Sequence, residues 1–177
     1  MLNHDITTLV DALLTELGGG PSLRLACRLP WQPEAVDLVS AGLDIFDREQ
    51  YMTPETLSQW LAMAANAQQD GIELQLISAF RSVDYQCQLV RRKALAGQNL
   101  DAIFRVSAIP GFSEHHTGRA LDITCPNSDP LEESFETTDA FAWLHANASR
   151  FKFFMTYPRN NAAGIIYEPW HWACQAD

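Results

Sequence analysis

Apolar residues recur every three or four positions in four segments of the chain, a spacing typical of amphipathic helices. These segments are, approximately, residues 4–17, 54–69, 83–96 and 139–148. Thr53 and Thr138 precede the second and fourth segments, and Ser82 or Asp84 begins the third. Such side chains accept a hydrogen bond from the first free N–H groups of a helix. Glycines follow the first three segments, as is common where a helix ends.

Alternating apolar and polar residues predict short strands. We expect them at 22–29, 72–78, 120–124, 153–155 and 165–172, with a short helix near 34–43 and irregular structure at 98–112 and 126–136. Helices precede most of the strands, a distribution that favours an α+β fold over a parallel βαβ arrangement.

Composition narrows the class of protein. At 177 residues and 47% hydrophobic content, the chain can form one domain with a full core, with or without an N-terminal extension. The formal net charge is −10, from 22 acidic and 12 basic residues, which argues against nucleic-acid binding and against adhesion to anionic membranes.

The N-terminus has no basic region that would mark a secretory signal, and no apolar run approaches the roughly 20 residues of a membrane span. The four cysteines are scattered without a CxxC pair. We therefore expect a cytoplasmic protein with reduced thiols, Cys125 being a buried structural thiol. His4 and His145 are expected at the surface.

The stretch Ser113–Asp122 carries the densest candidate chemistry, because it contains His115, His116 and Asp122. Imidazole and carboxylate groups suit a zinc ion. Gly118 permits a bend, after which a buried strand would hold Asp122 on a rigid element.

A second cluster, Tyr167–Trp172, adds Glu168 and the imidazole of His171. Our hypothesis is that the two clusters meet around one metal ion. Three protein ligands leave a fourth position for water, which is the arrangement of catalytic zinc sites. Taken singly, His115, Asp122 and His171 would more often be polar core or surface residues than metal ligands.

Three segments resemble the zinc D-alanyl-D-alanine carboxypeptidases of the VanY type, which share a fold with the hedgehog signalling domain. They are S-x-x-R-S-x-x-x-Q at Ser78–Gln86, S-x-H-x-x-G-x-A-x-D at Ser113–Asp122, and E-P-W-H at Glu168–His171. The resemblance runs from about Thr53 to Trp172. It implies a central antiparallel sheet with flanking helices and a zinc peptidase core over 53–177. Residues 1–52 lie outside the resemblance, and we expect them to form an N-terminal helical extension packed on the core.

The resemblance also implies the metal ligands. It places Zn²⁺ on His115, Asp122 and His171 and makes Glu168 the catalytic base. If residues 115–122 were extended, alternation would favour His116 over His115 as the ligand, because it shares the parity of Asp122. The family pattern favours His115. His116 departs from that pattern, in which glutamine is usual.

Substrate contacts are implied for Arg81, Gln86 and Ser113. The planar fork of Arg81 could grip the terminal carboxylate of a peptide or stabilise an oxyanion, so it counts as both a catalytic and a binding candidate. Gln86 lies one helical turn further along and could orient either group. The alternatives are a surface salt bridge for Arg81 and a plain turn residue for Ser113.

We expect a zinc peptidase that removes the C-terminal D-alanine from peptidoglycan stem peptides or their precursors. The same machinery could instead serve as an L,D-carboxypeptidase, a D,D-dipeptidase or a stem-peptide endopeptidase. A non-catalytic, zinc-bound recognition module is the alternative from another class, because a fold does not settle a function. Such a module would need neither Glu168 nor Arg81.

Overall fold

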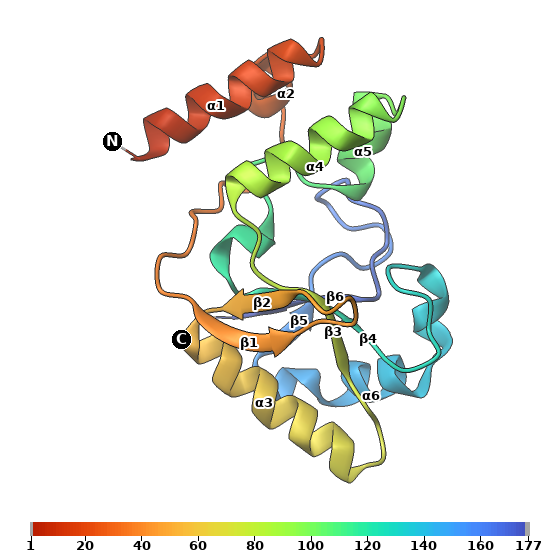
Figure 1. Cartoon of the computed structure of the whole chain (residues 1–177). Coiled ribbons are helices and arrows are strands. Elements are labelled where there is room, and N and C mark those ends of the chain that lie inside the picture. The colour runs from red at the N-terminus through yellow and green to blue at the C-terminus, as the bar shows by residue number, and fades with distance from the viewer. Residues whose placement is uncertain (1, 176–177) are drawn as a thin grey trace.

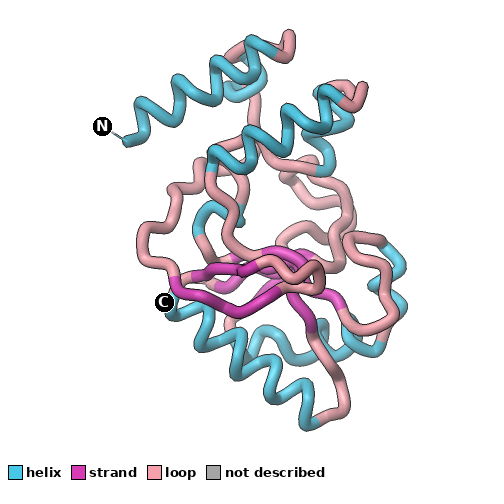
Figure 2. The backbone as a smooth tube through the Cα atoms, viewed as in Figure 1, coloured by secondary structure: helices cyan, strands magenta, loops and turns pink. Residues whose placement is uncertain are grey.

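The computed structural model describes residues 2–175, with side chains from residue 5 onward, so His4 lies outside the described side chains. The α-helices are α1 (Leu2–Glu16), α2 (Ser22–Leu25), α3 (Pro54–Gln69), α4 (Val83–Leu95), α5 (Leu100–Val106) and α6 (Asp139–Asn147). The strands are β1 (Val39–Leu43), β2 (Glu49–Met52), β3 (Gln75–Ser78), β4 (Ala120–Thr124), β5 (Phe153–Met155) and β6 (His171–Cys174). Short 3-10 helices are η1 (Glu114–Thr117), η2 (Glu133–Thr137) and η3 (Ala148–Phe151). Figures 1 and 2 show this α+β arrangement.

The central sheet has four strands in the order β3-β4-β6-β5, and every neighbouring pair is antiparallel. β1 and β2 form a separate antiparallel hairpin. This hairpin is bonded to the segment around β3, because the amide of Phe80 donates to the carbonyl of Tyr51 and that of Ile45 donates to the carbonyl of Leu76.

One face of the sheet packs on a lower helical layer, α3 and α6, which Figure 1 shows beneath the strands. Leu121 and Ile123 of β4 and Trp172 of β6 share one buried cluster with Met63 of α3 and Leu144 of α6. Strand side chains alternate between faces, so burying Leu121 and Ile123 on this side sends Asp122 to the other.

The opposite side of the sheet carries an upper helical layer of α1, α4 and α5 (Figure 1). Leu13 and Leu14 of α1 pack in a second buried cluster with Val90 of α4 and Ile103 of α5. An ion pair of 2.8 Å between Arg91 and Glu16 also joins α4 to α1. None of the described helices has the length and apolarity needed to cross a bilayer.

The predicted helix starts are confirmed. Thr53, Ser82 and Thr138 each accept a hydrogen bond from the backbone N–H three residues further on, at 3.3, 3.0 and 3.1 Å. Of the two candidates for α4, Ser82 is the cap.

Several predicted elements are wrong. Residues 22–25 form the helical turn α2 instead of a strand. The reason is that Leu23, Cys27 and Leu29 pack against the buried cluster of the upper helical layer, here called the upper cluster, and pair with no strand. The helix expected at 34–43 is replaced by β1, which pairs with β2. Residues 98–112 contain α5, which the side chain of Asn99 caps.

Two predicted strands are shorter than expected. β3 begins at Gln75 instead of residue 72, and β6 begins at His171 instead of residue 165. In the second case a turn at Glu168–His171 precedes the strand, because the amide of His171 donates to the carbonyl of Glu168.

Candidate metal centre and its cavity

The register of the sheet places three polar residues in one row on the upper face. Asp122 in the middle of β4 pairs with His171 of β6 on one side and with Ser78 of β3 on the other. Directly opposite residues on antiparallel strands have neighbouring side chains. The Asp122 Oδ1 and His171 Nδ1 atoms are 3.0 Å apart.

His115 reaches the same point from η1, a 3-10 helix instead of the extended segment on which the parity argument rested. Gly118, at φ 65°, ends η1 and turns the chain into β4. A Cβ atom there would lie 2.9 Å from the side chain of Leu38, so a larger residue would crowd this turn. His115 Nε2 lies 3.3 Å from Asp122 Oδ1.

His116 lies outside this group, although sequence parity favoured it. Its Nδ1–H donates to the carbonyl of Arg81 at 2.6 Å, and its Nε2 accepts from the amide of Gly111 at 3.0 Å. Burial lowers the pKa of His116 to about 4, in keeping with a neutral ring. His116 therefore braces the backbone at Arg81.

In both His115 and His171, one ring nitrogen forms a hydrogen bond away from the site. This bond turns the other ring nitrogen toward Asp122. His115 Nδ1–H donates to the carbonyl of Ala79 at 2.6 Å, which leaves Nε2 for the site. His171 Nε2–H donates to Glu114 Oε2 at 2.9 Å, which leaves Nδ1. Partners of this kind fix the tautomer and orientation of metal-binding histidines.

Glu114 is a site residue that the sequence analysis missed. Its Oε2 accepts from the hydroxyl of Thr156 at 2.6 Å as well as from His171. Although burial lowers the pKa of His171, its hydrogen bonds to Asp122 and Glu114 outweigh that effect and raise the pKa to about 10, so a metal ion would displace a proton from Nδ1. The only sequence signal was a carboxylate next to a candidate histidine ligand.

The donor atoms fit a small divalent cation. One ligand atom each from His115, Asp122 and His171 lie within 4.8 Å of one another. The contacts of 3.0 and 3.3 Å are close to the separation of about 3.3 Å that zinc bonds of about 2.0–2.1 Å give in a tetrahedral site. Nitrogen and oxygen donors of this kind are typical zinc ligands.

Arg81 approaches the same acceptors. Its Nη2 lies 2.7 Å from His115 Nε2 and 2.5 Å from Asp122 Oδ2, and its Nε donates to Ser78 Oγ at 3.0 Å. Burial alone would raise the pKa of Asp122, but the charges of His115 and Arg81 hold it well below its usual range. The ring nitrogen of His115 and the carboxylate of Asp122 thus already face the positive guanidinium of Arg81.

Glu168 is brought beside this group by the β-turn that precedes β6. Pro169 occupies the second position of the turn, where its fixed φ is favourable. The Glu168 carboxylate lies 4.0 Å from His171 Nδ1. Burial raises the pKa of Glu168 to about 7, against the opposing charge of His171. A carboxylate with such a pKa can both accept and return a proton near neutral pH.

A cavity of about 400 Å³ opens above these residues, between the sheet and the upper helical layer. Arg81, Ser113 and Glu168 line it together with the three candidate ligands. Gln86 is fully buried and does not line it; its side-chain amide donates to the carbonyl of Ala108, which does. Gln86 therefore reaches the cavity only through Ala108.

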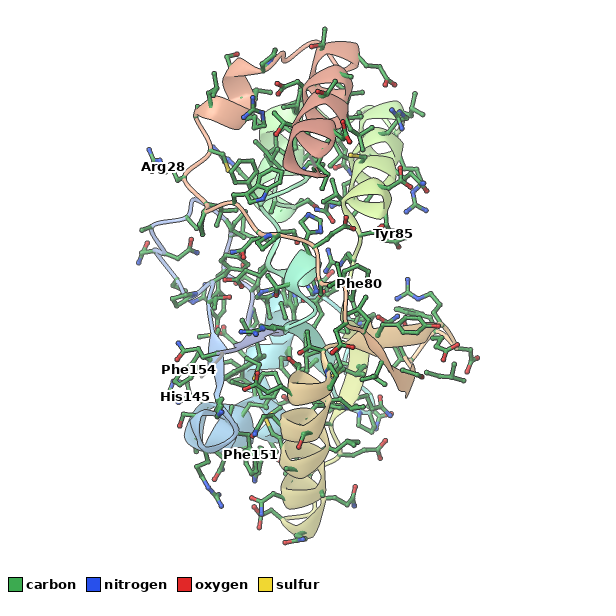
Figure 3. The ribbon with its side chains drawn as sticks, turned by 90° about the vertical axis from the view of Figure 1, so that its left-hand side faces the viewer. Arg28, Phe80, Tyr85, His145, Phe151 and Phe154 are labelled. Carbon is green, nitrogen blue, oxygen red and sulfur yellow. The ribbon has the colours of Figure 1, made fainter. Side chains whose placement is uncertain are left out.

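Other residues considered earlier lie away from the cavity. Cys125 is half-buried beyond the end of β4 and is a free thiol, and His145 is exposed on α6. Figure 3 shows His145 and Phe151 with the lower helical layer and Tyr85 with the upper one.

Comparison with known proteins gives the family. The sequence profile of VanY, D-alanyl-D-alanine carboxypeptidase, matches residues 49–176, a segment that contains every candidate site residue. The chain belongs to the VanY family. YodJ of Bacillus subtilis (strain 168), a protein named as a carboxypeptidase, is 32% identical over 151 residues, which cover 81% of this chain and 55% of YodJ.

Solved structures agree with this VanY assignment. The LdcB LD-carboxypeptidase superposes with a TM-score of 0.71 at 30% identity, covering 82% of this chain and 71% of LdcB. VanYB in complex with D-alanine-D-alanine gives a TM-score of 0.66 at 22% identity, covering 85% and 84%. The expected α+β fold of the hedgehog-like peptidases is therefore confirmed. The chain spans only about half the length of YodJ.

Proposed function

We propose that this protein is a zinc peptidase that removes the C-terminal D-alanine from a peptidoglycan stem peptide or precursor. The observation that carries the proposal is the meeting of His115, Asp122 and His171 with the raised-pKa carboxyl of Glu168 in one cavity. Membership of the VanY family supports the substrate class. A homologous VanY structure contains Zn(II), which supports the choice of metal.

Zinc held by His115 Nε2, an Asp122 oxygen and His171 Nδ1 would polarise the scissile carbonyl and lower the pKa of a water to about 7. Glu168 accepts the proton of the attacking water at its carboxylate. As the carbon–nitrogen bond breaks, Glu168 returns this proton to the leaving amine nitrogen. The side chain of Arg81 supplies N–H donors beside the carbonyl oxygen, where negative charge develops.

The test is product analysis by mass spectrometry. The zinc-loaded protein is incubated with the stem pentapeptide, the tetrapeptide and free D-alanyl-D-alanine, each with and without a chelator. Loss of one alanine from the pentapeptide alone, abolished by the chelator, is the expected result. Absence of cleavage from a protein with one bound zinc would overturn the proposal in favour of the recognition module.

An L,D-carboxypeptidase is the second candidate. It is favoured by the likeness to LdcB, described as an LD-carboxypeptidase, at 30% identity. Such an enzyme shortens the tetrapeptide, whose terminal D-alanine follows an L-centre, and leaves the pentapeptide intact. The same incubation therefore separates the two activities.

A further inference from the structure

A lysine on α4 places a positive charge on the cavity wall above the metal centre. Lys93 is half-buried and lines the cavity. Its ammonium donates to the hydroxyl of Ser107 at 2.7 Å, and Ser107, itself buried, follows directly after α5. Among the described residues, Lys93 Nζ contacts this hydroxyl and forms no ion pair with a carboxylate. The ammonium is thus held in place without a charge partner.

The other cations that line the cavity are already paired. Arg81 directs its guanidinium at Ser78, His115 and Asp122. Arg48 pairs with Asp44 at 2.7 Å and donates to the carbonyl of Ile77 at 2.9 Å. Within the described part of the cavity wall, Lys93 is therefore the cation left for an anionic ligand.

Lys93 lies close enough to the reacting groups to matter for them. Burial and the nearby charge of Arg81 lower the pKa of Lys93, while the charge of Glu168 raises it. The positive charge of Lys93 in turn lowers the pKa of Glu168, against the larger effect of burial. Lys93 and Glu168 therefore line the same cavity and interact electrostatically within it.

We infer that Lys93, held by Ser107, binds the terminal carboxylate of the peptide and so restricts cleavage to the last residue. This assignment rests on the proposed function, because only an enzyme that removes a terminal residue meets a carboxylate so near the scissile bond. Arg81, whose Nη2 lies beside the proposed ligands His115 and Asp122, is then the group placed at the carbonyl oxygen. The neighbouring Val106 and Ile165 give the cavity an apolar wall that suits a small methyl side chain.

Lysine at this position gives a physical basis for selecting acids over amides. A substrate whose carboxyl end is blocked, or continues into further chain, would bury the ammonium of Lys93 without a counter-charge. Leaving such a group unpaired is costly, so a site built for it rejects the neutral analogue strongly.

The experiment compares two versions of the cleaved peptide, one with a free carboxyl end and one with a terminal amide. Lys93→Met removes the charge, Lys93→Arg keeps it, and Arg92→Met removes a charge from the exposed neighbour on the same helix. We expect the native protein and Arg92→Met to prefer the acid. For the Lys93→Met variant, kcat/KM on the peptide with a free carboxyl end should fall by roughly 30- to 1,000-fold, mainly because KM rises. Its kcat/KM on the amidated peptide should change little. Lys93→Arg should restore much of the preference.

Two outcomes would overturn the assignment while leaving the proposed function intact. One is a Lys93→Met protein that folds, cleaves the acid and keeps the native acid-to-amide ratio. The other is that cleavage is slowed by amidation of an internal carboxylate of the stem peptide and not by amidation of the terminal carboxylate.

A binding measurement separates failure of this inference from failure of the proposed function. Zinc-loaded Glu168→Gln protein, with and without Lys93→Met, is titrated calorimetrically with both peptides. Tighter binding of the acid that disappears with Lys93→Met supports the assignment, even where the native protein shows no turnover. Equal binding of acid and amide by the Glu168→Gln protein overturns it.

Discussion

The floor and the roof of the cavity are built in different ways. The floor is the sheet, where backbone pairing between β4 and β6 sets Asp122 against His171. The roof consists of side chains from α4 and α5, such as Lys93 and Val106, and these helices pack on α1. The VanY profile begins at residue 49, so α1 lies before the matched segment.

This difference separates two tasks. Among the residues that would hold the metal and move the proton, Asp122 and His171 are placed by strand register, His115 by η1 and Glu168 by a proline turn. Residues that would select the substrate sit on helices whose positions depend on packing with the N-terminal segment. We therefore expect changes in the floor to alter the chemical step and changes in the roof to alter substrate binding.

The largest expected effect is on the floor. Glu168→Gln should lower kcat by roughly 10²- to 10⁴-fold, because the amide cannot accept the proton of the attacking water. Zinc stoichiometry, measured by elemental analysis, should be unchanged because Glu168 is not one of the three proposed ligands. An unaltered kcat would show that the base is another residue.

Shortening one buried leucine in each hydrophobic cluster tests the difference between the floor and the roof directly. Leu14 of the upper cluster and Leu144 of the lower cluster are both fully buried. Replacement of either by alanine should lower the free energy of unfolding by about 2–5 kcal/mol, as measured in urea. Only Leu14→Ala should also raise KM, since α1 supports the roof. Equal KM values in the two variants would argue that α1 does not shape the cavity.

Glu114 supports the floor from outside the cavity. Glu114→Gln should weaken zinc binding by roughly 10- to 100-fold, because the amide is a poorer acceptor for the His171 Nε2–H. A competitive chelator titration measures this loss. Glu132→Gln, which alters an exposed glutamate, is the control. If both variants bind zinc equally well, the Glu114–His171 contact does not tune the metal site.

The smallest effect concerns the β1–β2 hairpin at the cavity rim. The Asp44 side chain accepts from the amides of Phe46 and Arg48, from Arg48 Nε and from Gln50 Nε2. Burial raises the pKa of Asp44, but these hydrogen bonds outweigh it, so the folded pKa lies below the ordinary value. Asp44→Asn should therefore cost about 1–2 kcal/mol of stability at neutral pH.

The sign of the pH dependence follows from that lowered pKa. The charged Asp44 stabilises the folded state above the unfolded pKa of about 3.9, and this contribution disappears as the pH falls through the lower folded value. The stability difference between the native protein and Asp44→Asn should therefore shrink as the pH falls below about 4. A difference that grows on acidification would contradict this account. Urea unfolding at several pH values measures it.

Local signals in the sequence were sufficient for much of the floor. The alternation around Asp122 predicted a buried strand, and the threonine and serine caps predicted three helix starts. These features depend on neighbouring residues alone. The motif spacing of the VanY resemblance then supplied what local patterns could not, namely that His115 and His171 belong to one site.

The missed features depend on contacts between distant segments. Glu114 bonds to a histidine 57 positions away, so its place next to His115 in the chain does not by itself predict its role. None of the residues of β1 is fully buried, and its apolar pattern is correspondingly weak. α5 is different, because Asn99 and the spacing of Leu100, Ile103 and Phe104 could have indicated a short helix.

The contact between Asp122 and His171 also affects how the protein folds. These residues are 49 positions apart and meet only when β4 and β6 pair in the observed register. A slip of one residue would place Leu121 or Ile123 opposite His171 and turn Asp122 toward the core. A metal ion that binds the native pair disfavours every slipped sheet, since binding stabilises only the state that can bind. Metal affinity is thus also a measure of how completely the sheet has formed.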